Sequence, residues 1–457
     1  MRTTPETTAL TIPACAQTAL DVLEGAGIEA WLVGGFVRDS ILGRNVHDVD
    51  IACSAPWQQT KQAFEATGFA VHETGTAHGT VTAMVDGWPI EITTYRSEGA
   101  YSDGRHPDSV SQAQTIEEDL ARRDFSINAI AYHPTRGFRD PYNGLADIEA
   151  GLIRCVGDAR ERFREDHLRI LRACRFCSEL GFSIEAETYS SMMHGKTFML
   201  TLPAERVSAE LTRFLLGKHV HDALMQTVDV LSGVVPELVA MKGFDQHSRY
   251  HKYDVLEHTA WVVQGTEPAP LTRWAALLHD IGKPGAYFMR DGVGHFFGHA
   301  NVSVVIARGL LERLKFPTKM KNDILTLVEL HDEMIGPTPR LVKRTLRSFG
   351  GDVELFRALC DLKRADALSH ASCCTGRAEL AEELLDVLDK VLAEDQAFTL
   401  SQLAITGSDV ISECKIEAGP KVGKALDRAL DAVIEERVAN ERGALIAYVK
   451  SFANNLA

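Results

Sequence analysis

A short segment near the N-terminus combines residue types that suit phosphate and metal chemistry. Two glycines, Gly34 and Gly35, close an apolar run, and Arg38 follows them before Asp48 and Asp50. Alternate side chains of a β-strand share a face, so the two carboxylates would project together and repel each other without a cation between them. Mg²⁺ takes carboxylate oxygens completed by substrate phosphates, glycine permits close backbone approach, and arginine pairs with phosphate charge. The segment therefore predicts a triphosphate and Mg²⁺ site.

The Asp-x-Asp spacing is a weak signal by itself, because most such pairs lie in solvated turns. The paired glycines a short helix earlier strengthen the prediction. Glu91, which is polar in a neighbouring strand pattern, is a candidate third carboxylate, and an exposed strand glutamate is the alternative interpretation.

Asp166 and Arg169 form a second candidate site. Three residues apart, they would lie next to each other on one helical face and present a hydrogen-bond acceptor beside donors. Cytosine and adenine both offer an amino donor next to a ring-nitrogen acceptor, whereas guanine and uracil offer an oxygen acceptor next to an N–H donor. The pair could therefore select C and A without a nucleic-acid template. The alternative is an ordinary intrahelical salt bridge.

Composition sets the limits for both sites. The chain has 457 residues, 45% apolar and 24% charged, with nine scattered cysteines and a net charge of −15. This composition fits two to four globular domains with reduced thiols. The acidic total argues against a polyanionic partner, yet basic residues cluster in 159–176 and 339–350, where a local surface could hold RNA. The absence of a membrane-span pattern and of a signal-peptide pattern predicts a cytoplasmic protein with no membrane partner.

The elements that must position these residues change along the chain. Residues 10–26 predict an amphipathic helix, followed by short β-rich runs in "EAWLVGG", "VDIACS", "GTVTAMVDG" and "PIEITTYR" around the helical "PWQQTKQAFEATG". From about residue 151 the spacing is helical, as in 160–180, 203–216, 253–265 and 378–393. Residues 94–120 are polar and without period, which predicts a long functional or disordered loop. We expect an α/β first third and an all-helical remainder.

Several segments, taken together, resemble the bacterial class II CCA-adding tRNA nucleotidyltransferases and their poly(A) polymerase relatives. They are "GGFVRD…DVD", "DLARRDFSINAIAY" (119–132), "DPYNGLADIEAGLIRCVGDARERF" (140–163), "REDHLRILRACRF" (164–176) and "ERVSAELTRFLL" (205–216). The resemblance runs from about residue 28 to residue 220. It implies an α+β chain with a polymerase-β-like head in a mixed sheet, then an all-helical neck, body and tail.

The resemblance also assigns roles. It implies Asp48 and Asp50 as catalytic Mg²⁺ ligands, and nucleotide contacts from Gly34, Gly35, Arg38, Arg123, Asp124, Asn128, Asp166, Arg169, Arg172 and Arg175. The implied reaction is attack of the tRNA 3′-hydroxyl on the α-phosphorus of CTP or ATP, with release of pyrophosphate and two metal ions. Loop 94–120 would take part in the switch from C to A addition.

Further along the chain, histidines and aspartates recur in helical stretches. A His-Asp doublet such as His279 and Asp280 is costly to bury in an apolar helix unless a metal ion or hydrogen bonds satisfy it. A single such histidine is more often a core residue. The segment "HDIGK" resembles the HD phosphohydrolase superfamily, which implies metal ligands His258, His279, Asp280, His299 and His331, with Asp332 or Asp366 and a phosphate contact from Lys283.

That second resemblance implies hydrolysis of phosphomonoesters or 2′,3′-cyclic phosphates with Ni²⁺, Mn²⁺ or Fe, which suit imidazole better than Mg²⁺ does. We predict four domains: a head in 1–150, a neck and body in 151–243, an HD domain in 244–340 and a tRNA-binding tail in 341–457. The partners are tRNA, ATP and CTP, and protein partners stay open. Two alternatives remain: an A-adding enzyme or poly(A) polymerase, and an HD phosphohydrolase with a vestigial transferase site.

Overall fold

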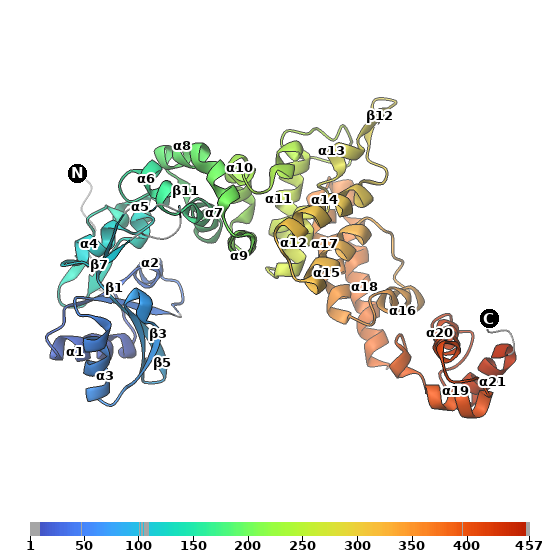
Figure 1. Cartoon of the computed structure of the whole chain (residues 1–457). Coiled ribbons are helices and arrows are strands. Elements are labelled where there is room, and N and C mark those ends of the chain that lie inside the picture. The colour runs from blue at the N-terminus through green and yellow to red at the C-terminus, as the bar shows by residue number, and fades with distance from the viewer. Residues whose placement is uncertain are drawn as a thin grey trace. The chain divides into compact units, whose positions relative to one another are not determined.

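The computed structural model describes residues 10–46, 48–99, 101, 104, 109–394 and 396–453. The chain divides into two compact units, Met1–Val235 and Pro236–Ala457 (Figure 1). In the described part of the chain, no helix has the length and apolar character needed to cross a membrane.

The first unit begins with a seven-stranded mixed sheet in the order β3-β4-β5-β2-β1-β8-β9. Only β2 and β5 run parallel, and the other neighbours are antiparallel. The strands are β1 (Ala30–Val33), β2 (Val49–Cys53), β3 (Ala70–Gly75), β4 (Thr80–Val85), β5 (Trp88–Thr94), β8 (Ala131–His133) and β9 (Gly137–Arg139). The predicted mixed sheet of the head is confirmed.

Helices cover this sheet, whose central strands β1 and β2 are buried except at Asp50. All four residues of β1 are buried, which matches its continuous apolar run. Helix α2 packs on β1 and β2, whereas α1 and α3 pack together against β4 and β5. The helices of the head are α1 (Ala14–Gly25), α2 (Gly35–Ile41), α3 (Trp57–Ala66), α4 (Ile116–Ala121) and α5 (Gly144–Ala150).

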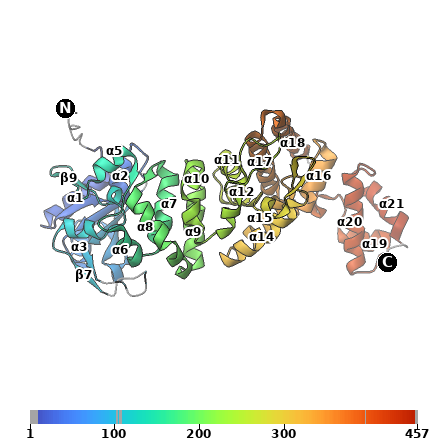
Figure 2. The same cartoon turned by 90° about the horizontal axis from the view of Figure 1, so that it is seen from above.

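The rest of the first unit is a helical layer in which α7, α8 and α10 lie side by side (Figure 2). Helix α7 is central, since it packs against both α9 and α10 and buries ten of its thirteen residues. The helices are α6 (Ala159–Glu165), α7 (Leu168–Leu180), α8 (Ala186–Gly195), α9 (Ala204–Leu215) and α10 (Val220–Leu231).

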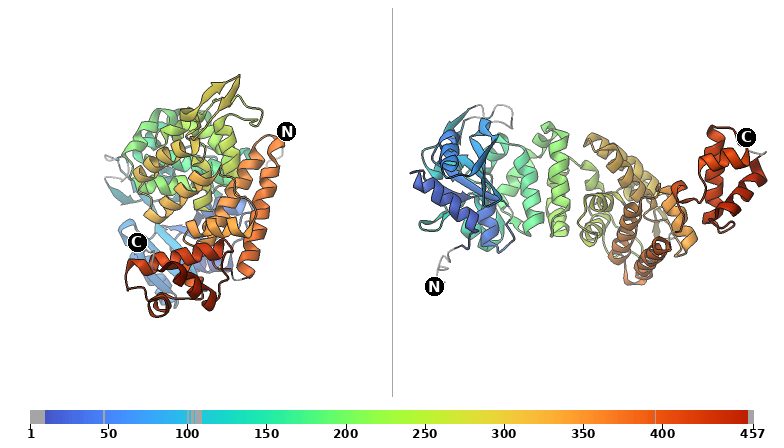
Figure 3. Two further views of the ribbon diagram at one scale, coloured as in Figure 1. Left: turned by 90° about the vertical axis from the view of Figure 1, so that its right-hand side faces the viewer. Right: turned by 90° about the horizontal axis from the view of Figure 1, so that it is seen from below.

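The second unit is a helical body followed by a tail. In the body α17 packs against α11, α12, α15 and α18. Its helices are α11 (Val255–Gly265), α12 (Pro270–Leu278), α13 (Lys283–Ala286), α14 (His299–Arg313), α15 (Thr318–Leu330), α16 (Pro339–Ser348), α17 (Val353–Ser369) and α18 (Gly376–Ala393). The tail helices α19 (Gly407–Cys414), α20 (Pro420–Ile434) and α21 (Arg442–Phe452) gather into one bundle with its own apolar core (Figure 3).

Three local expectations need correction. The helix predicted over 160–180 is two helices, because Asp166 has an extended backbone and ends α6. The loop predicted over 94–120 contains a small hairpin, β6 (Arg96–Glu98) with β7 (Val110–Gln112), and then α4. Residues 100, 102–103 and 105–108 of that loop lie outside the described residues.

The third correction concerns the helical remainder, which contains two short strand pairs. Strands β10 (Leu152–Ile153) and β11 (Ser183–Ile184) pair in parallel, and β12 (Phe288–Arg290) and β13 (Val293–His295) form a hairpin. The hairpin turns at Asp291 and Gly292, both with positive φ. Asp-Gly between β-rich runs is a strong hairpin signal, so this hairpin could have been predicted from the sequence.

The basic residues at the start of the tail are used internally. On α16, Arg340 pairs with Glu435 at 2.6 Å, and Arg347 pairs with Asp427 at 3.3 Å and also with Asp431. These acids lie on α20 or just beyond its end. The basic face of α16 therefore helps to hold the tail bundle.

Tight packing between α7 and the α9–α10 connection gives a test of the fold. A Cβ added at Gly217 would lie 2.0 Å from Ser178 Oγ and 2.6 Å from its carbonyl group, which includes backbone. We expect Gly217→Ala to lower Tm by roughly 4–10 °C, because overpacking against backbone costs about 1–3 kcal/mol. Gly25→Ala is the matched control, since a Cβ there meets nothing within 4 Å. Equal Tm values for the two variants would contradict this packing.

Candidate active site and candidate metal centre

The first unit contains a cavity of about 750 Å³ between the sheet edge and helix α7. Its wall carries ten arginines against seven carboxylates, so this surface is basic although the whole chain is acidic. Arginine suits the planar, bidentate recognition of phosphate. The wall includes every predicted nucleotide contact: Gly34, Gly35, Arg38, Arg123, Asp124, Asn128, Asp166, Arg169, Arg172 and Arg175.

The predicted metal ligands lie at the N-terminal end of β2. Asp50 lines the cavity, whereas Asp48 is exposed immediately before the strand. Glu91 is the register partner of Asp50 on parallel strand β5 and lines the same cavity. Burial and then the Glu91 and Asp48 charges, opposed by Arg123, raise the pKa of Asp50 to about 6. A carboxylate held among acids in this way fits a divalent cation, which would remove the repulsion.

Gly34 allows three groups of the site to meet. Its φ of 70° and ψ of −137° belong to a region that residues other than glycine rarely adopt. A Cβ at this position would lie 2.8 Å from Arg123 Nη1 and 3.7 Å from Asp50 Oδ2. The glycine therefore lets the Arg123 guanidinium pass close to the backbone beside the carboxylate.

Asp124 ties the sheet to helix α7 and to α2. Its Oδ2 accepts from Arg172 Nε at 2.8 Å, and its Oδ1 accepts from Asn128 Nδ2 at 3.0 Å. Asn128 Oδ1 in turn accepts from Arg38 Nη1 at 2.6 Å. Burial alone would raise the pKa of Asp124, but Arg172 and these hydrogen bonds outweigh it and lower the pKa to about 2. Two arginines of the cavity are thus held through one carboxylate.

Phe176 is a second anchor for the same arginines. The guanidinium carbons of Arg38, Arg172 and Arg175 lie 5.0, 5.5 and 4.2 Å from its ring centroid. Contacts of this kind are worth about 0.5–2 kcal/mol each. The sequence analysis did not single out Phe176, and its only signal was its place on the predicted Arg172–Arg175 helix face.

The predicted pair Asp166 and Arg169 lies at a helix junction and not on one helix. Asp166 Oδ1 accepts from Leu168 N at 3.0 Å at the start of α7. Arg169 Nη1 donates to Glu165 Oε2 at 2.5 Å, and its Nη2 donates to the Arg122 carbonyl at 3.0 Å. These contacts do not include the alternative Asp166–Arg169 salt bridge. Both side chains line the cavity.

Asp119 is a site residue that the sequence analysis missed. It is almost fully buried and pairs with Arg122 at 2.8 Å and with Arg123 at 3.2 Å. The Arg122 and Arg123 charges outweigh burial and lower its pKa. An acid three and four residues before two arginines on a helix was the available signal.

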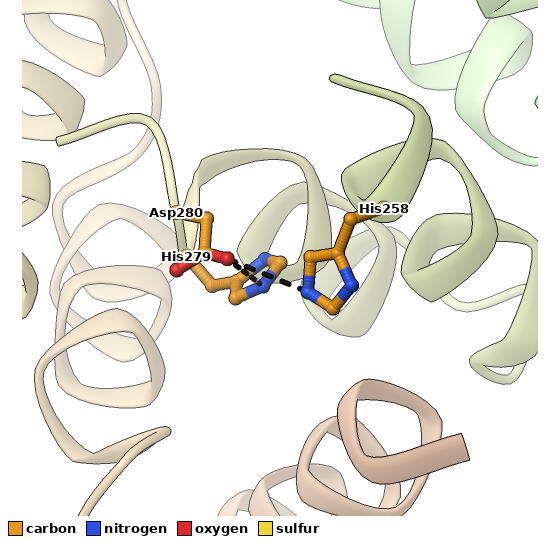
Figure 4. Close-up of side chains that lie close together, drawn as sticks. All are labelled: His258, His279 and Asp280. Atoms are coloured by element: carbon orange, nitrogen blue, oxygen red, sulfur yellow. Dashed lines mark ion pairs between the residues drawn. The ribbon is translucent and has the colours of Figure 1, made fainter. Parts of the chain in front are cut away.

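The second unit brings the predicted HD residues together. His258 comes from α11, and His279 and Asp280 follow α12; their side chains point toward one another (Figure 4). His258 Nε2 and His279 Nε2 lie 3.4 and 3.2 Å from Asp280 Oδ2. On the other side of the carboxylate, Oδ1 lies 3.3 Å from His299 Nε2 and 3.7 Å from His331 Nε2. Asp280 is therefore shared by two sets of imidazoles.

Backbone carbonyls orient these imidazoles. The Nδ1 atoms of His279, His299 and His331 lie 2.7, 3.0 and 2.7 Å from the carbonyl oxygens of residues 276, 296 and 328. A carbonyl only accepts, so Nδ1 carries a proton in each of these rings and Nε2 is the nitrogen that faces the cluster, as in metal-bound histidine.

The facing nitrogens then need a cation. The Nε2 atoms of His299 and His331 lie 3.1 Å apart. Burial lowers the pKa of His331 to about 3, which keeps this imidazole neutral at physiological pH. Two lone pairs at this distance repel unless a metal ion or a proton joins them. The donor set of imidazoles and carboxylates fits a transition metal.

The structure adds two residues to this cluster. Asp366, which the sequence offered as one option, lies 3.0 Å from His258 Nε2, and His370 lies 3.5 Å from Asp366. The cluster contains three triads whose donor atoms lie within 4.8 Å: His258–His279–Asp280, His258–Asp366–His370 and Asp280–His299–His331. Asp332, the other option, instead pairs with Arg377 at 3.5 Å. Lys283 Nζ lies 2.6 Å from Asp280 Oδ2.

A mixed head sheet with carboxylates on its inner strands β2 and β5, followed by helices that supply arginines to one cavity, defines a nucleotidyltransferase fold. Family models agree with it. Residues 30–154 match the poly A polymerase head domain, residues 181–241 match "Probable RNA and SrmB-binding site of polymerase A", and residues 295–449 match tRNA nucleotidyltransferase domain 2.

Relatives along nearly the whole chain give the family. The CCA-adding enzyme of Streptococcus thermophilus is 31% identical over 96% of this chain and 98% of its own length. That of Geobacillus kaustophilus is 32% identical over 93% and 94%. The structure of the Bacillus stearothermophilus CCA-adding enzyme with CTP is 27% identical, covers 97% of this chain and 99% of its own, and gives a TM-score of 0.74. The chain belongs to the CCA-adding enzyme family and is a nucleotidyltransferase.

The Asp124 network gives a pH-dependent prediction. The carboxyl pKa falls from 3.8 to about 2 on folding, so its stabilisation is complete above pH 4 and is lost as pH falls toward 2. We expect Asp124→Asn to cost roughly 2 kcal/mol at pH 7, from a shift of about two pKa units. Urea unfolding of variant and native protein at pH 7 and at pH 3 measures this. A stability difference that stays constant across these pH values would contradict the assignment.

Proposed function

We propose that the chain adds C, C and A to the 3′ end of tRNA from CTP and ATP, with release of pyrophosphate and without a nucleic-acid template. The observation that carries the proposal is the arginine-lined cavity that holds Asp50 beside Glu91 in a chain of this family. The CTP complex of the Bacillus relative and the tRNA nucleotidyltransferase match in residues 295–449 support the substrates.

The roles of the residues follow from their positions. Asp48 and Asp50 would hold Mg²⁺, with Glu91 next to them, and Mg²⁺ when bound neutralises charge on the attacking and leaving oxygens. Arg38 and Arg123 would bind the triphosphate beside Gly34 and Gly35. Asn128 and Asp124 would orient Arg38 and Arg172, and Arg175 would hold Phe176 in place.

Base selection would fall to Asp166 and Arg169. In this structure Arg169 donates to Glu165 and to backbone carbonyls, so base reading requires that at least one of these bonds opens. Asp166 Oδ1 accepts from Leu168 N, and Asp166 Oδ2 lies 4.0 Å from Arg206 Nη2. The Oδ2 atom is therefore accessible to an amino group of a base. A-only addition and poly(A) synthesis are the alternatives, because the same residues would accept adenine.

The nucleotide assay decides among these alternatives. Purified protein with Mg²⁺ and tRNA lacking its last three nucleotides should add two C from CTP alone and then one A when ATP is present, and stop. Asp50→Asn should reduce addition by about 10²-fold or more, because it removes charge stabilisation of the reacting phosphates. Products are resolved at single-nucleotide length.

Glu149→Gln is the matched control, since Glu149 is exposed on α5 outside the cavity and should leave addition unchanged. Addition of A alone, or an unlimited A tail, would reassign the chain to the alternative enzymes. Undiminished addition by Asp50→Asn would exclude the proposed transferase site.

We further propose a divalent transition metal, Mn²⁺, Ni²⁺ or Fe²⁺, in the His-Asp cluster and hydrolysis of phosphate esters there. The paired Nε2 atoms of His299 and His331 support the metal, and Lys283 beside Asp280 supports an anionic substrate. The four-domain division also remains our proposal, with the HD domain extended through α17 because Asp366 joins the cluster.

Metal removal and return tests this second site. After chelation, Mn²⁺ at 100 times its Kd should stabilise the protein by about 2.7 kcal/mol and allow phosphate release from glycerol 2-phosphate. His331→Gln should abolish both effects and retain nucleotide addition. His247→Asn, at an exposed position with positive φ that asparagine tolerates, is the control. Stabilisation without phosphate release would leave a structural metal and exclude hydrolysis.

A further inference from the structure

The hairpin β12–β13 carries an exposed stack of aromatic rings. Phe288 and His295 are cross-strand partners, and their rings stack with centroids 5.4 Å apart and planes 25° apart. Phe297 stacks on the same His295 ring at 5.4 Å and 19°. It also contacts Phe288 at 5.7 Å with the planes 44° apart, so the three rings of this stack touch one another. Phe297 is 75% exposed and Phe288 is 41% exposed. Figure 1 shows this hairpin projecting from the helices of the second unit.

Such a stack has no role in the core of the unit. Side chains of this size contribute most to stability when they are buried, and here their outer faces meet water. Three rings held in mutual contact by a strand pair and a short connection are instead pre-ordered, so another flat ring could stack on an exposed ring face without a large ordering cost. Exposed aromatic groups of this kind commonly mark binding sites.

The stack shares a cavity with the His-Asp cluster. A cavity of about 770 Å³ is lined by His295, Phe297, Asp280, His299, His331 and Asp366. The ring stack and the cluster are also close in sequence, because Phe297 lies two residues before His299. The Phe296 carbonyl accepts a hydrogen bond from His299 Nδ1. One short segment therefore carries both the last ring of the stack and a candidate metal ligand.

The cavity has two chemically different ends. The cluster end holds the imidazoles and carboxylates. Its lining also includes Lys283, which pairs with Asp280, and Arg377, which pairs with Asp332. The hairpin end offers ring faces. Its volume lies within the range of about 300–1,000 Å³ that is usual for small-molecule sites. A ligand with a flat ring at one end and a phosphate at the other matches both ends.

We infer that the ring stack, through His295 and Phe297, which line the cavity, binds the nucleobase of a nucleoside phosphate or of an RNA 3′-terminal nucleotide, whose phosphate lies at the His-Asp cluster. This inference rests on the proposed hydrolytic function and specifies its substrate class. Each base stacked on an aromatic side chain contributes about 1–3 kcal/mol, largely independent of base identity. The site therefore distinguishes a ligand that has a base from one that has none, and does not distinguish one base from another.

The test compares a ligand that has a base with one that has none. Adenosine 3′-monophosphate and glycerol 2-phosphate are each titrated calorimetrically into the full-length Mn²⁺-loaded protein and into Phe297→Ala, and their hydrolysis is followed by phosphate release. We expect Phe297→Ala to weaken binding of the nucleotide and raise its KM about tenfold or more, with glycerol 2-phosphate unchanged. The first unit is the same in both proteins, so the difference between them reports on the second unit.

Met289→Ala is the matched control, because Met289 is exposed on the same hairpin and does not line the cavity. Equal nucleotide binding by native protein and Phe297→Ala would overturn the inference, as would an equal loss for both ligands. If neither ligand is hydrolysed by native protein, the hydrolytic function fails, and the difference in nucleotide binding still decides the inference. Phe297-dependent binding to anionic phospholipid vesicles, with unchanged nucleotide binding, would assign the stack to a lipid surface.

Discussion

The cost of holding charges close together inside protein governs both sites of this chain. In the first unit the arginines that face the cavity would repel each other, and several of them are held by a buried acid or by the Phe176 ring. Asp124 fixes Arg172 and, through Asn128, Arg38; Asp119 fixes Arg122 and Arg123. Both acids also line the cavity, so each of them lowers the net positive charge of this surface while it fixes its arginines.

The His-Asp cluster of the second unit poses the opposite problem. Asp280 and the surrounding imidazoles would be unfavourable as a buried set without a cation, and backbone carbonyls fix each ring so that its Nε2 faces inward. The fold thus supplies a pre-oriented but electrostatically incomplete cluster. A bound metal would complete it, and metal affinity would then contribute directly to the stability of the helices that supply the ligands.

The comparison of the two sites shows what residue type alone can indicate. The Gly-Gly and Asp-x-Asp segment lies at the cavity because strand β2 and helix α2 are local elements, and their residues are close in sequence. The predicted nucleotide contacts on α7 share one helix face, so the period of the helix brings them together. The sequence analysis missed Asp119 and Phe176 because they contact the arginines and not a substrate. An acid or a phenylalanine in a helix is also too common to indicate a site.

The amino-acid sequence by itself determined the α/β head and the helical character of the rest. Through the family resemblance it also gave the mixed head sheet and the ten predicted nucleotide contacts that line the cavity. These depend on local periodicity and on motifs whose members lie within a few turns. Tertiary structure alone decided the break at Asp166, the contacts of Arg169, and the meeting of His258 with Asp366, which are 108 residues apart in sequence. It also placed the aromatic hairpin in the cavity of the metal cluster. Contacts at such separation depend on how helices pack, and no local pattern encodes that packing.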